Sequence, residues 1–370
     1  MHAPAKRSRK PNRVKQSDAV ADSVEAAEEA GLRYVSDEHP GYTRKAKGDD
    51  FEYFDTEGKL ISDEQRILRI KRLAIPPAWT QVWISPSSNG HIQATGRDDR
   101  CRKQYRYHER WREVRDENKY DRILIFGKAL PKIRRRVARD LKLPGLPRDK
   151  VRATVVQLLE RTFIRIGNEE YARDNKSFGL TTMKDRHVAV KGSKLRFRFR
   201  GKSGRDHEVD ITDRRIAGIV AKLQDLPGQD LFQSVDDDGE VQDVSSHDVN
   251  EYLREITGED FTAKDFRTWA GTVLTAIALK AQGEFETKKQ AEANIKAAIQ
   301  AVSKILGNTP PVCRKCYVHP GVLEMYLNGN SIEGLKQLTH EAIERDEIDF
   351  HANEKAVLKF LDKQLAKKSA

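Results

Sequence analysis

Cysteine is scarce in this 370-residue sequence, and long hydrophobic runs are absent from it. The cysteines are Cys101, Cys313 and Cys316, an odd number that predicts reduced thiols and a cytoplasmic setting. No apolar run approaches the roughly 20 residues that span a bilayer, and no apolar signal core follows the basic N-terminus. We therefore expect neither secretion nor insertion into a membrane.

Patterns of metal and nucleotide sites are also missing. Cys313 and Cys316 form a CxxC pair, but a zinc site needs further ligands at suitable spacing, and only His319 is near. A redox pair would need a βαβ context, whereas this pair lies in a helical region. The GKS of residues 201–203 lacks the earlier glycine of a phosphate-binding loop, and no tight carboxylate set indicates a metal-dependent nuclease. The sequence thus predicts no metal and no cofactor.

Basic residues are in excess, with 68 Lys and Arg against 57 Asp and Glu, a formal charge of +11 and a pI of about 9.4. This excess predicts a polyanionic partner. Residues 1–30 are expected to form a disordered basic arm, since residues 1–15 carry six Lys and Arg and no acid. The segment from Arg97 to Arg115 mixes eight Lys and Arg with Tyr105, Tyr107 and Trp111. Such a mixture suits contacts to phosphates and base edges, although a solvated charged face is the alternative.

Residues 31–113 are predicted to form a separate β-rich domain. Five short extended runs are broken by Gly, Pro, Asp and Asn, which indicates antiparallel strands, with one helix near Ser62 to Arg72. The runs are LRYVS, YTRKA, FEYFD, WTQVWIS and HIQATGR.

Residues 114–346 change to a mainly helical pattern. The segment from Val151 to Ile166 has one apolar face, and Arg165 is expected at the rim of that face. From Leu195 to Asp210, apolar residues alternate with arginines on either side of a GKSG turn, which predicts a β-hairpin with Lys202 at its tip. Residues 227–247 are acidic and are expected to form a loop. The predicted class is α+β, a small N-terminal antiparallel sheet domain followed by a larger helical domain that contains a short hairpin sheet.

Helix signals mark the later part of this domain. Thr262 and Asp265 predict a capping box, with Phe261 and Phe266 as a hydrophobic staple, at the start of a helix with Arg267 in its second turn. Further helices are expected from the periodicity, and residues 347–370 form a C-terminal helical tail. Their ranges are about Phe285 to Leu306, Ile332 to Glu344 and Asn353 to Lys367.

The stretch from Gly307 to Pro320, GNTPPVCRKCYVHP, presents Tyr317 in a short basic turn after that long helix. A phenol with a pKa of about 10 is only about 0.1% ionised at neutral pH, a deficit of roughly 4 kcal/mol for a nucleophile. Fixed cations could supply that energy. Without them, Tyr317 is an ordinary half-buried tyrosine.

Five segments in the same order resemble the motifs of small poxvirus-like and bacterial type IB DNA topoisomerases, over roughly residues 35 to 330. They are GRDDRCRKQYRY, FIRIGNEEYARDNKSFGLTTMKDRHV, FRGKSGRDHEV, KDFRTWAG and GNTPPVCRKCY. The resemblance implies the catalytic fold shared by these enzymes and tyrosine recombinases. It further implies an enzyme that relaxes supercoiled double-stranded DNA in the cytoplasm, associated with the nucleoid, as a monomer that clamps the duplex without ATP or metal.

The resemblance also implies the residue roles. Tyr317 would attack a DNA phosphodiester and form a 3′-phosphotyrosyl bond, Arg165 and Arg267 would hold the non-bridging oxygens, and Lys202 would protonate the leaving 5′ oxygen. The implied DNA contacts are Arg102, Lys103, Gln104, Tyr105, Tyr107 and Tyr171.

One position departs from the family pattern. Many members have a histidine nine residues before the tyrosine, where this chain has Asn308. An amide donates a hydrogen bond but carries no positive charge, so we expect Asn308 to be a neutral donor, and His319 is a weak substitute. A tyrosine recombinase remains an alternative, although recombinases typically have a histidine where this chain has Lys264. An architectural DNA-binding protein without chemistry is the other alternative.

Overall fold

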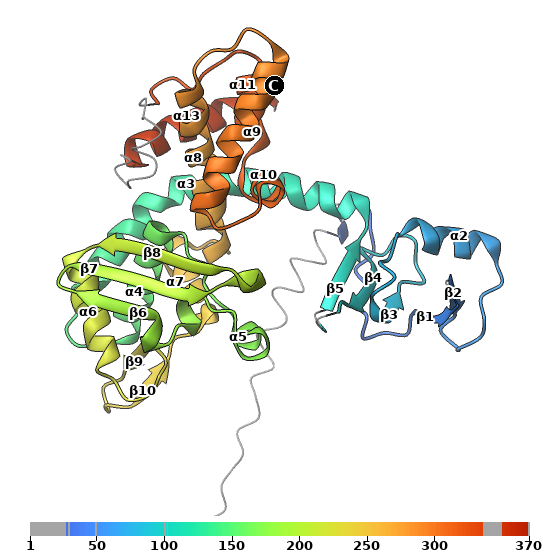
Figure 1. The fold of residues 1–370 in the computed structure, drawn as a ribbon, viewed down its shortest axis with the longest axis horizontal. Coiled ribbons are helices and arrows are strands. Elements are labelled where there is room, and N and C mark those ends of the chain that lie inside the picture. Colours follow the sequence, from blue (N-terminus) through green and yellow to red (C-terminus); the bar gives the residue numbers. More distant parts are fainter. Residues whose placement is uncertain are drawn as a thin grey trace, which may run out of the picture. The chain divides into compact units, whose positions relative to one another are not determined.

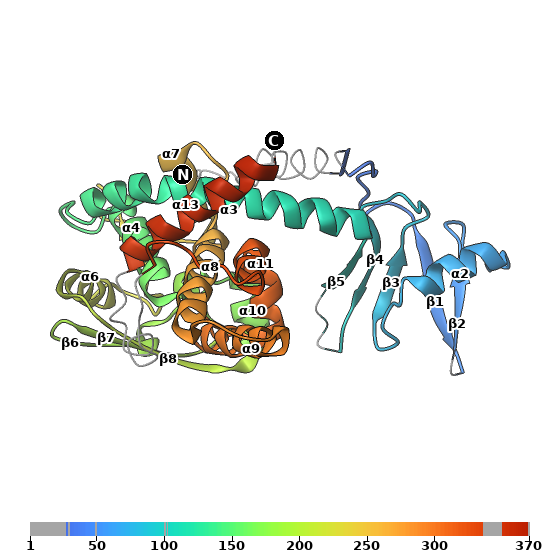
Figure 2. The same cartoon turned by 90° about the horizontal axis from the view of Figure 1, so that it is seen from above.

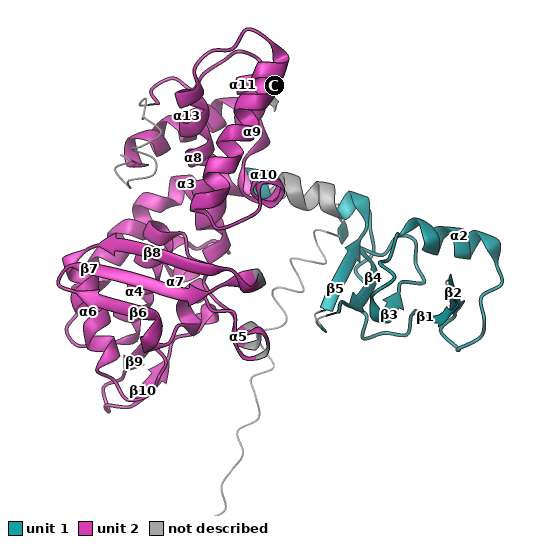
Figure 3. Cartoon of the chain, in the orientation of Figure 1, with its two compact units in different colours: residues 1–120 teal, residues 121–370 magenta. Residues whose placement is uncertain are grey.

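The computed structural model describes residues 27–28, 30–48, 50–99, 101, 103–335 and 350–368 (Figure 1). Nearly all of the predicted basic arm, residues 1–30, lies outside them. The chain divides into two compact units, residues 1–120 and 121–370 (Figure 3). The division between residues 120 and 121 falls within the long helix α3, Glu109–Asp140. The boundary predicted from the sequence, between residues 113 and 114, lies in the same helix.

The first unit contains a five-stranded antiparallel sheet in the order β2-β1-β3-β4-β5. Its strands are β1 (Tyr42–Lys47), β2 (Asp50–Phe54), β3 (Thr80–Ile84), β4 (Ile92–Arg97) and β5 (Lys103–Tyr107). Four of them match the predicted runs, but the prediction of a strand at LRYVS is wrong. Arg33 makes only an isolated bridge to Gly90, and the Val35 N–H donates to His91 Nδ1 at 3.0 Å instead of to a neighbouring strand. The fifth strand is β5, within the basic and aromatic segment.

Helix α2, Glu64–Arg72, covers the core of this sheet and confirms the predicted helix. It begins where the Asp63 carboxylate accepts a hydrogen bond from Arg66 N at 2.8 Å, which satisfies one of the free amides of the first turn. Its Ile70 is buried with Ile84 and Ala94 of the sheet. Burial of these side chains stabilises the small unit.

The second unit is mainly helical, which confirms the predicted fold class. Its helices are α4 (Arg148–Thr162), α5 (Glu169–Asn175), α6 (Arg214–Gln224), α7 (Ser246–Thr257), α8 (Ala263–Gln282), α9 (Lys288–Ile305), α10 (Pro310–Tyr317), α11 (Pro320–Leu327) and α13 (Phe350–Lys368). In the described part of this unit they are accompanied by the short 3-10 turns η1 (Leu180–Thr182), η2 (Asp185–His187) and η3 (Lys202–Gly204). Within the described ranges, no helix has the length and apolar character needed to cross a membrane.

A three-stranded antiparallel sheet in this unit contains the predicted hairpin. Its order is β6-β7-β8, with β6 at Val188–Lys191, β7 at Lys194–Arg200 and β8 at Asp206–Thr212. Along β7 every second residue is buried, and the exposed Arg196 and Arg198 pair with Asp210 and Glu208 of β8. Residues 227–247, expected to be a loop, instead include a small second hairpin, β9 (Gln233–Val235) and β10 (Val241–Asp243), because their backbone groups pair across a turn.

Helix α8 is the centre of the second unit, with α9, α10 and α11 gathered around it (Figure 2). Asp265 Oδ2 accepts a hydrogen bond from Thr262 N at 2.7 Å, as the predicted capping box requires. Phe261 and Phe266 both pack edge-on against Phe126 of α3. These contacts fix the start of α8, where Arg267 lies.

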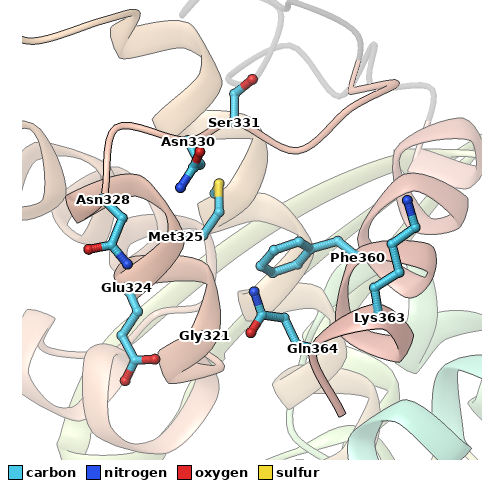
Figure 4. Close-up of a pocket in the computed structure, with 9 residues that line it drawn as sticks. All are labelled: Gly321, Glu324, Met325, Asn328, Asn330, Ser331, Phe360, Lys363 and Gln364. Carbon is cyan, nitrogen blue, oxygen red and sulfur yellow. The ribbon is translucent and has the colours of Figure 1, made fainter. Parts of the chain in front are cut away.

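The C-terminal helix α13 packs against α8 through a buried carboxylate. Glu354 Oε1 accepts a hydrogen bond from Trp269 Nε1 at 2.7 Å, and the same carboxylate pairs with Arg134 at 2.9 Å. Between α11, the loop that follows it and α13 lies a pocket of about 290 Å³, which Met325 and Phe360 line (Figure 4). The helix predicted near Ile332 to Glu344 lies mostly in residues 336–349, outside the described part.

Replacing Glu354 with alanine tests this attachment. Glu354→Ala leaves Arg134 without one of its two carboxylates and the buried Trp269 N–H without an acceptor, so we expect a loss of about 2–3 kcal/mol in the free energy of unfolding. Urea unfolding followed by circular dichroism measures it. The matched control is Asp362→Ala on the same helix, whose ion pair with Lys128 is more than half exposed and should change stability by less than about 0.5 kcal/mol. Equal losses in the two variants would contradict the packing of α13.

Candidate active site

Tyr317 is the last residue of α10, so the stretch expected to be a basic turn is a short helix. Helix α9 ends at Ile305 with Leu306 as its C-cap, Gly307 takes a positive φ of 61°, and two prolines occupy the first turn of α10. Proline is favoured there because the first helical amides have no intrahelical partner. The hydroxyl of Thr272 on α8 donates to the Tyr317 carbonyl at 3.3 Å and accepts from His319 N at 3.1 Å.

Gly271 allows α10 to approach α8 closely. A Cβ atom at position 271 would lie 2.5 Å from the Tyr317 carbonyl oxygen and 2.8 Å from the Tyr317 Cβ. Real atoms do not come this close, so any larger side chain would displace the tyrosine backbone. The backbone of Tyr317 is therefore held by a helix that packs directly against it.

Arg165 does not lie on a helix rim as the sequence suggested. Helix α4 ends at Thr162, and Phe163 takes a left-handed conformation with φ of 52°. The Arg165 carbonyl then accepts a hydrogen bond from Leu180 N at 2.9 Å, which holds this segment extended. From there Arg165 Nη2 donates to Asn308 Oδ1.

Arg267 joins three segments of the site. Its side chain is only 4% exposed, and it donates hydrogen bonds to the carbonyls of Phe163 and, at 2.6 Å, of Leu306. Its guanidinium carbon lies 5.1 Å from the centre of the Tyr317 ring. A single cation thus connects the end of α4, the end of α9 and the candidate nucleophile.

Lys202 lies in η3 at the tip of the β7–β8 hairpin, as predicted, and it is exposed. It lines a small pocket of about 30 Å³ together with Arg165 and Arg267. All three predicted catalytic cations, which are far apart in the sequence, therefore border one pocket. His207 borders it too, and the sequence analysis did not select this residue.

The electrostatic environment favours ionisation of Tyr317. Burial by itself would raise the pKa of the phenol, but the charges of Arg267 and Arg165 outweigh burial and bring the pKa below its ordinary value. Burial and the neighbouring Arg165 also lower the pKa of Arg267, although Tyr317 opposes this shift. The arrangement is thus suited to stabilising negative charge close to Tyr317.

Two buried N–H donors at the site have no acceptor among the described residues. They are Asn308 Nδ2 and Arg267 Nε. Because Arg165 donates to Asn308 Oδ1, the NH₂ group of the Asn308 amide points away from the Arg165 guanidinium. Leaving a buried donor unsatisfied costs about 1–3 kcal/mol, so such donors indicate a site that an acceptor fills when substrate binds.

Four of the residues predicted to contact DNA, Lys103, Gln104, Tyr105 and Tyr107, lie on β5 in the first unit. Lys103 pairs with Asp37 at 2.7 Å, and Gln104 donates to Asp98 at 2.9 Å. Tyr105 and Tyr107 stack with ring centres 5.7 Å apart. Strand alternation puts Lys103, Tyr105 and Tyr107 on one face, and Gln104 on the other. Arg102 lies outside the described residues, as does the side chain of Tyr171 on α5.

The CxxC pair lies on α10 beside the site. Cys313 is buried, and burial raises the pKa of its thiol to about 11, whereas Cys316 is exposed. Among the described residues, no group of three or more His, Cys, Asp or Glu side chains could hold a metal ion.

Residues 108–345 match the model of the eukaryotic DNA topoisomerase I catalytic core, and residues 50–98 match that of the bacterial DNA topoisomerase IB N-terminal domain. The DNA topoisomerase 1B of Acanthamoeba polyphaga mimivirus is 34% identical over 78% of this chain and 88% of the viral protein. The DNA topoisomerase I of Monkeypox virus and the DNA topoisomerase 1B of Vaccinia virus (strain Copenhagen) are each 23% identical over 66% of this chain and 76% of their own length.

The fold, the order of the motifs and these matches define an isomerase that acts on DNA. This chain belongs to the type IB DNA topoisomerase family. The resemblance inferred from the sequence is confirmed. The catalytic roles of individual residues stay predictions, although the structure brings the side chain of Arg165 into contact with Asn308 and that of Arg267 into contact with Tyr317.

Gly271→Ala tests the contact that holds Tyr317. The added methyl group clashes with the tyrosine backbone, so we expect a loss of about 1–3 kcal/mol in unfolding free energy and a drop of at least about tenfold in DNA relaxation. Urea unfolding and a plasmid relaxation assay measure these effects. The matched control is Gly218→Ala on α6, where a Cβ meets nothing within 4 Å. That change should raise stability by about 0.5–1 kcal/mol and leave relaxation unchanged. Normal activity in Gly271→Ala would refute the proposed packing.

Proposed function

We propose that this topoisomerase relaxes supercoiled DNA through a covalent intermediate at Tyr317, without ATP or metal. The phenol oxygen attacks a DNA phosphodiester and forms a 3′-phosphotyrosyl bond, while the bond to the 5′ oxygen breaks. The observation that carries the proposal is the position of the buried Arg267 guanidinium, 5.1 Å from the centre of the Tyr317 ring. Religation is the reverse attack by the 5′ hydroxyl, so the energy of the broken bond is retained.

The first requirement of this mechanism is an activated phenol. The ionisation deficit of about 4 kcal/mol at neutral pH must be reduced by the protein or by the bound phosphate. Arg267 and Arg165 together lower the pKa of Tyr317 despite its burial. They would also hold the non-bridging oxygens as negative charge develops on them.

The second requirement is a set of donors aimed at the developing charge. Asn308 Nδ2 and Arg267 Nε are buried and lack acceptors among the described residues. A phosphoryl oxygen would satisfy both. Asn308 would thus serve as a neutral donor in the position where many relatives have a histidine.

The third requirement is a proton for the leaving 5′ oxygen. Lys202 is exposed at a hairpin tip and borders the same pocket as Arg165 and Arg267. Its ammonium group would donate that proton as the P–O bond breaks. During religation, the same amine would take the proton back from the 5′ hydroxyl.

We further propose that a monomer clamps double-stranded DNA in the cytoplasm, with β5 of the first unit contributing phosphate and sugar contacts. Lys103 and the stacked Tyr105 and Tyr107 share one face of that strand. Supercoils would relax by rotation of the free strand while the 3′ end stays bonded to Tyr317. Binding through phosphates should weaken steeply as salt rises.

Tyr317→Phe tests the nucleophile directly. The change removes only the hydroxyl, so we expect complete loss of relaxation and of covalent protein–DNA product, with unchanged DNA binding. Supercoiled plasmid is incubated with each protein in EDTA without ATP, and a denaturing gel detects the adduct. The plasmid carries no paired sites, so stepwise relaxation by the parent also argues against a recombinase. A mutant as active as the parent would remove Tyr317 from the mechanism, and a parent that binds but never cleaves would support an architectural role.

Asn308→Ala tests the proposed neutral donor. Loss of one donor to the developing charge typically slows the chemical step by about 10²–10³-fold, and we expect that loss with little change in DNA affinity. Single-turnover cleavage at saturating protein measures the rate, and a binding titration measures the affinity. Asn330→Ala, an exposed asparagine in the loop after α11, is the control and should cleave as the parent does. A loss of affinity without a loss of rate would show that Asn308 acts in binding alone.

A further inference from the structure

His207 lies between the two loops that carry Lys202 and Asn308. It is the second residue of β8 and pairs with Phe199 of β7, on which its ring stacks at 5.2 Å with an interplanar angle of 10°. The ring borders the small pocket with Arg165, Lys202 and Arg267.

Two glycines leave room for this ring. A Cβ at position 201 would lie 2.6 Å from His207 Cδ2, and a Cβ at position 307 would lie 2.5 Å from His207 Cε1. Gly201 immediately precedes Lys202, and Gly307 immediately precedes Asn308. The imidazole is thus packed closely against both glycines, with Gly201 at Cδ2 and Gly307 at Cε1, the two carbons that flank Nε2.

A long hydrogen bond also connects the hairpin tip with the loop that carries Asn308. Arg205 Nη1, from the hairpin tip, donates to the Asn308 carbonyl at 3.4 Å. The hairpin tip is closed by a hydrogen bond from Gly201 N to the Arg205 carbonyl at 2.7 Å. A movement of the ring would therefore reach Lys202 and Asn308 together.

The environment favours an uncharged ring. Burial, followed by the charges of Arg165, Arg267 and Arg205, lowers the pKa of His207, and Asp206 opposes this shift only in part. Within the described part of the chain, no hydrogen bond engages the ring nitrogens. The side chain thus contributes a flat shape rather than a charge.

We propose that His207 is a positioning residue that holds the Lys202 hairpin against the Gly307–Asn308 loop, so that the lysine reaches the leaving oxygen. This inference rests on the proposed function, in which Lys202 supplies the proton. The ring itself transfers no proton and contacts no reacting atom. Its removal should impair leaving-group protonation more than attack by Tyr317.

A pair of DNA substrates separates these two effects. One has the normal 5′ oxygen at the cleavage site, and the other has a 5′ bridging sulfur, which leaves as a thiolate and needs no general acid. His207→Ala should cleave the oxygen substrate about 100-fold more slowly than the parent and the sulfur substrate within about threefold of it. Lys202→Ala should show the same pattern. Single-turnover formation of the covalent adduct measures both rates.

A second variant keeps the test informative if alanine disturbs folding. His207→Phe retains a flat ring without nitrogens, so it should cleave both substrates within about threefold of the parent. His187→Phe is the control, since it alters a buried imidazole of the same unit that does not line the pocket. Any loss in that control should be equal on the two substrates.

Three results would overturn the inference. They are an equal loss on both substrates in His207→Ala, no loss on either, or a His207→Phe variant as slow on the oxygen substrate as Lys202→Ala. Failure of the proposed function has a different signature, because the parent protein itself would then form no adduct with either substrate. The outcome for the parent therefore separates the two.

Discussion

The site depends on one buried guanidinium. Burying a cation is costly unless its donors are satisfied, and Arg267 meets this requirement in part, with two backbone carbonyls and the face of an aromatic ring. Its Nε has no acceptor among the described residues. Among the described residues no carboxylate pairs with it. Its charge is therefore not neutralised inside the protein, and it remains available to an anion. The same side chain holds the loops after α4 and α9 through hydrogen bonds to the carbonyls of Phe163 and Leu306. Arg267 therefore serves both the fold and the proposed chemistry.

Local patterns predicted much of the fold. The alternation in β7, the start of α8 and the end of α9 are each set by neighbouring residues, and the structure agrees with all three. The prediction failed at Arg165, because Phe163 and Ile166 face the core from an extended segment just as they would from a helix. The hydrogen bond from Leu180 that holds this segment comes from a distant part of the chain. No periodicity in one segment can reveal it.

The candidate site was predictable only through the family resemblance. Composition and spacing do not connect Arg165, Lys202, Arg267 and Tyr317, which meet through tertiary packing alone. His207 and Gly271 were missed for the same reason, since a histidine in a strand and a glycine in a helix are ordinary features. The pairing of β7 with β8 would have placed His207 opposite Phe199, but its contacts with Gly201 and Gly307 require the folded structure.

The ion pairs described above affect how many of the basic side chains can release counterions when DNA binds. Arg196 and Arg198 on the exposed face of β7 are paired with Asp210 and Glu208, so the charges of these two arginines are matched within the protein. On α3, Arg134 and Arg136 are likewise paired with carboxylates. Cations already matched within the protein displace few counterions from a nucleic acid. The ions released when the duplex binds should therefore be considerably fewer than a count of lysine and arginine would suggest.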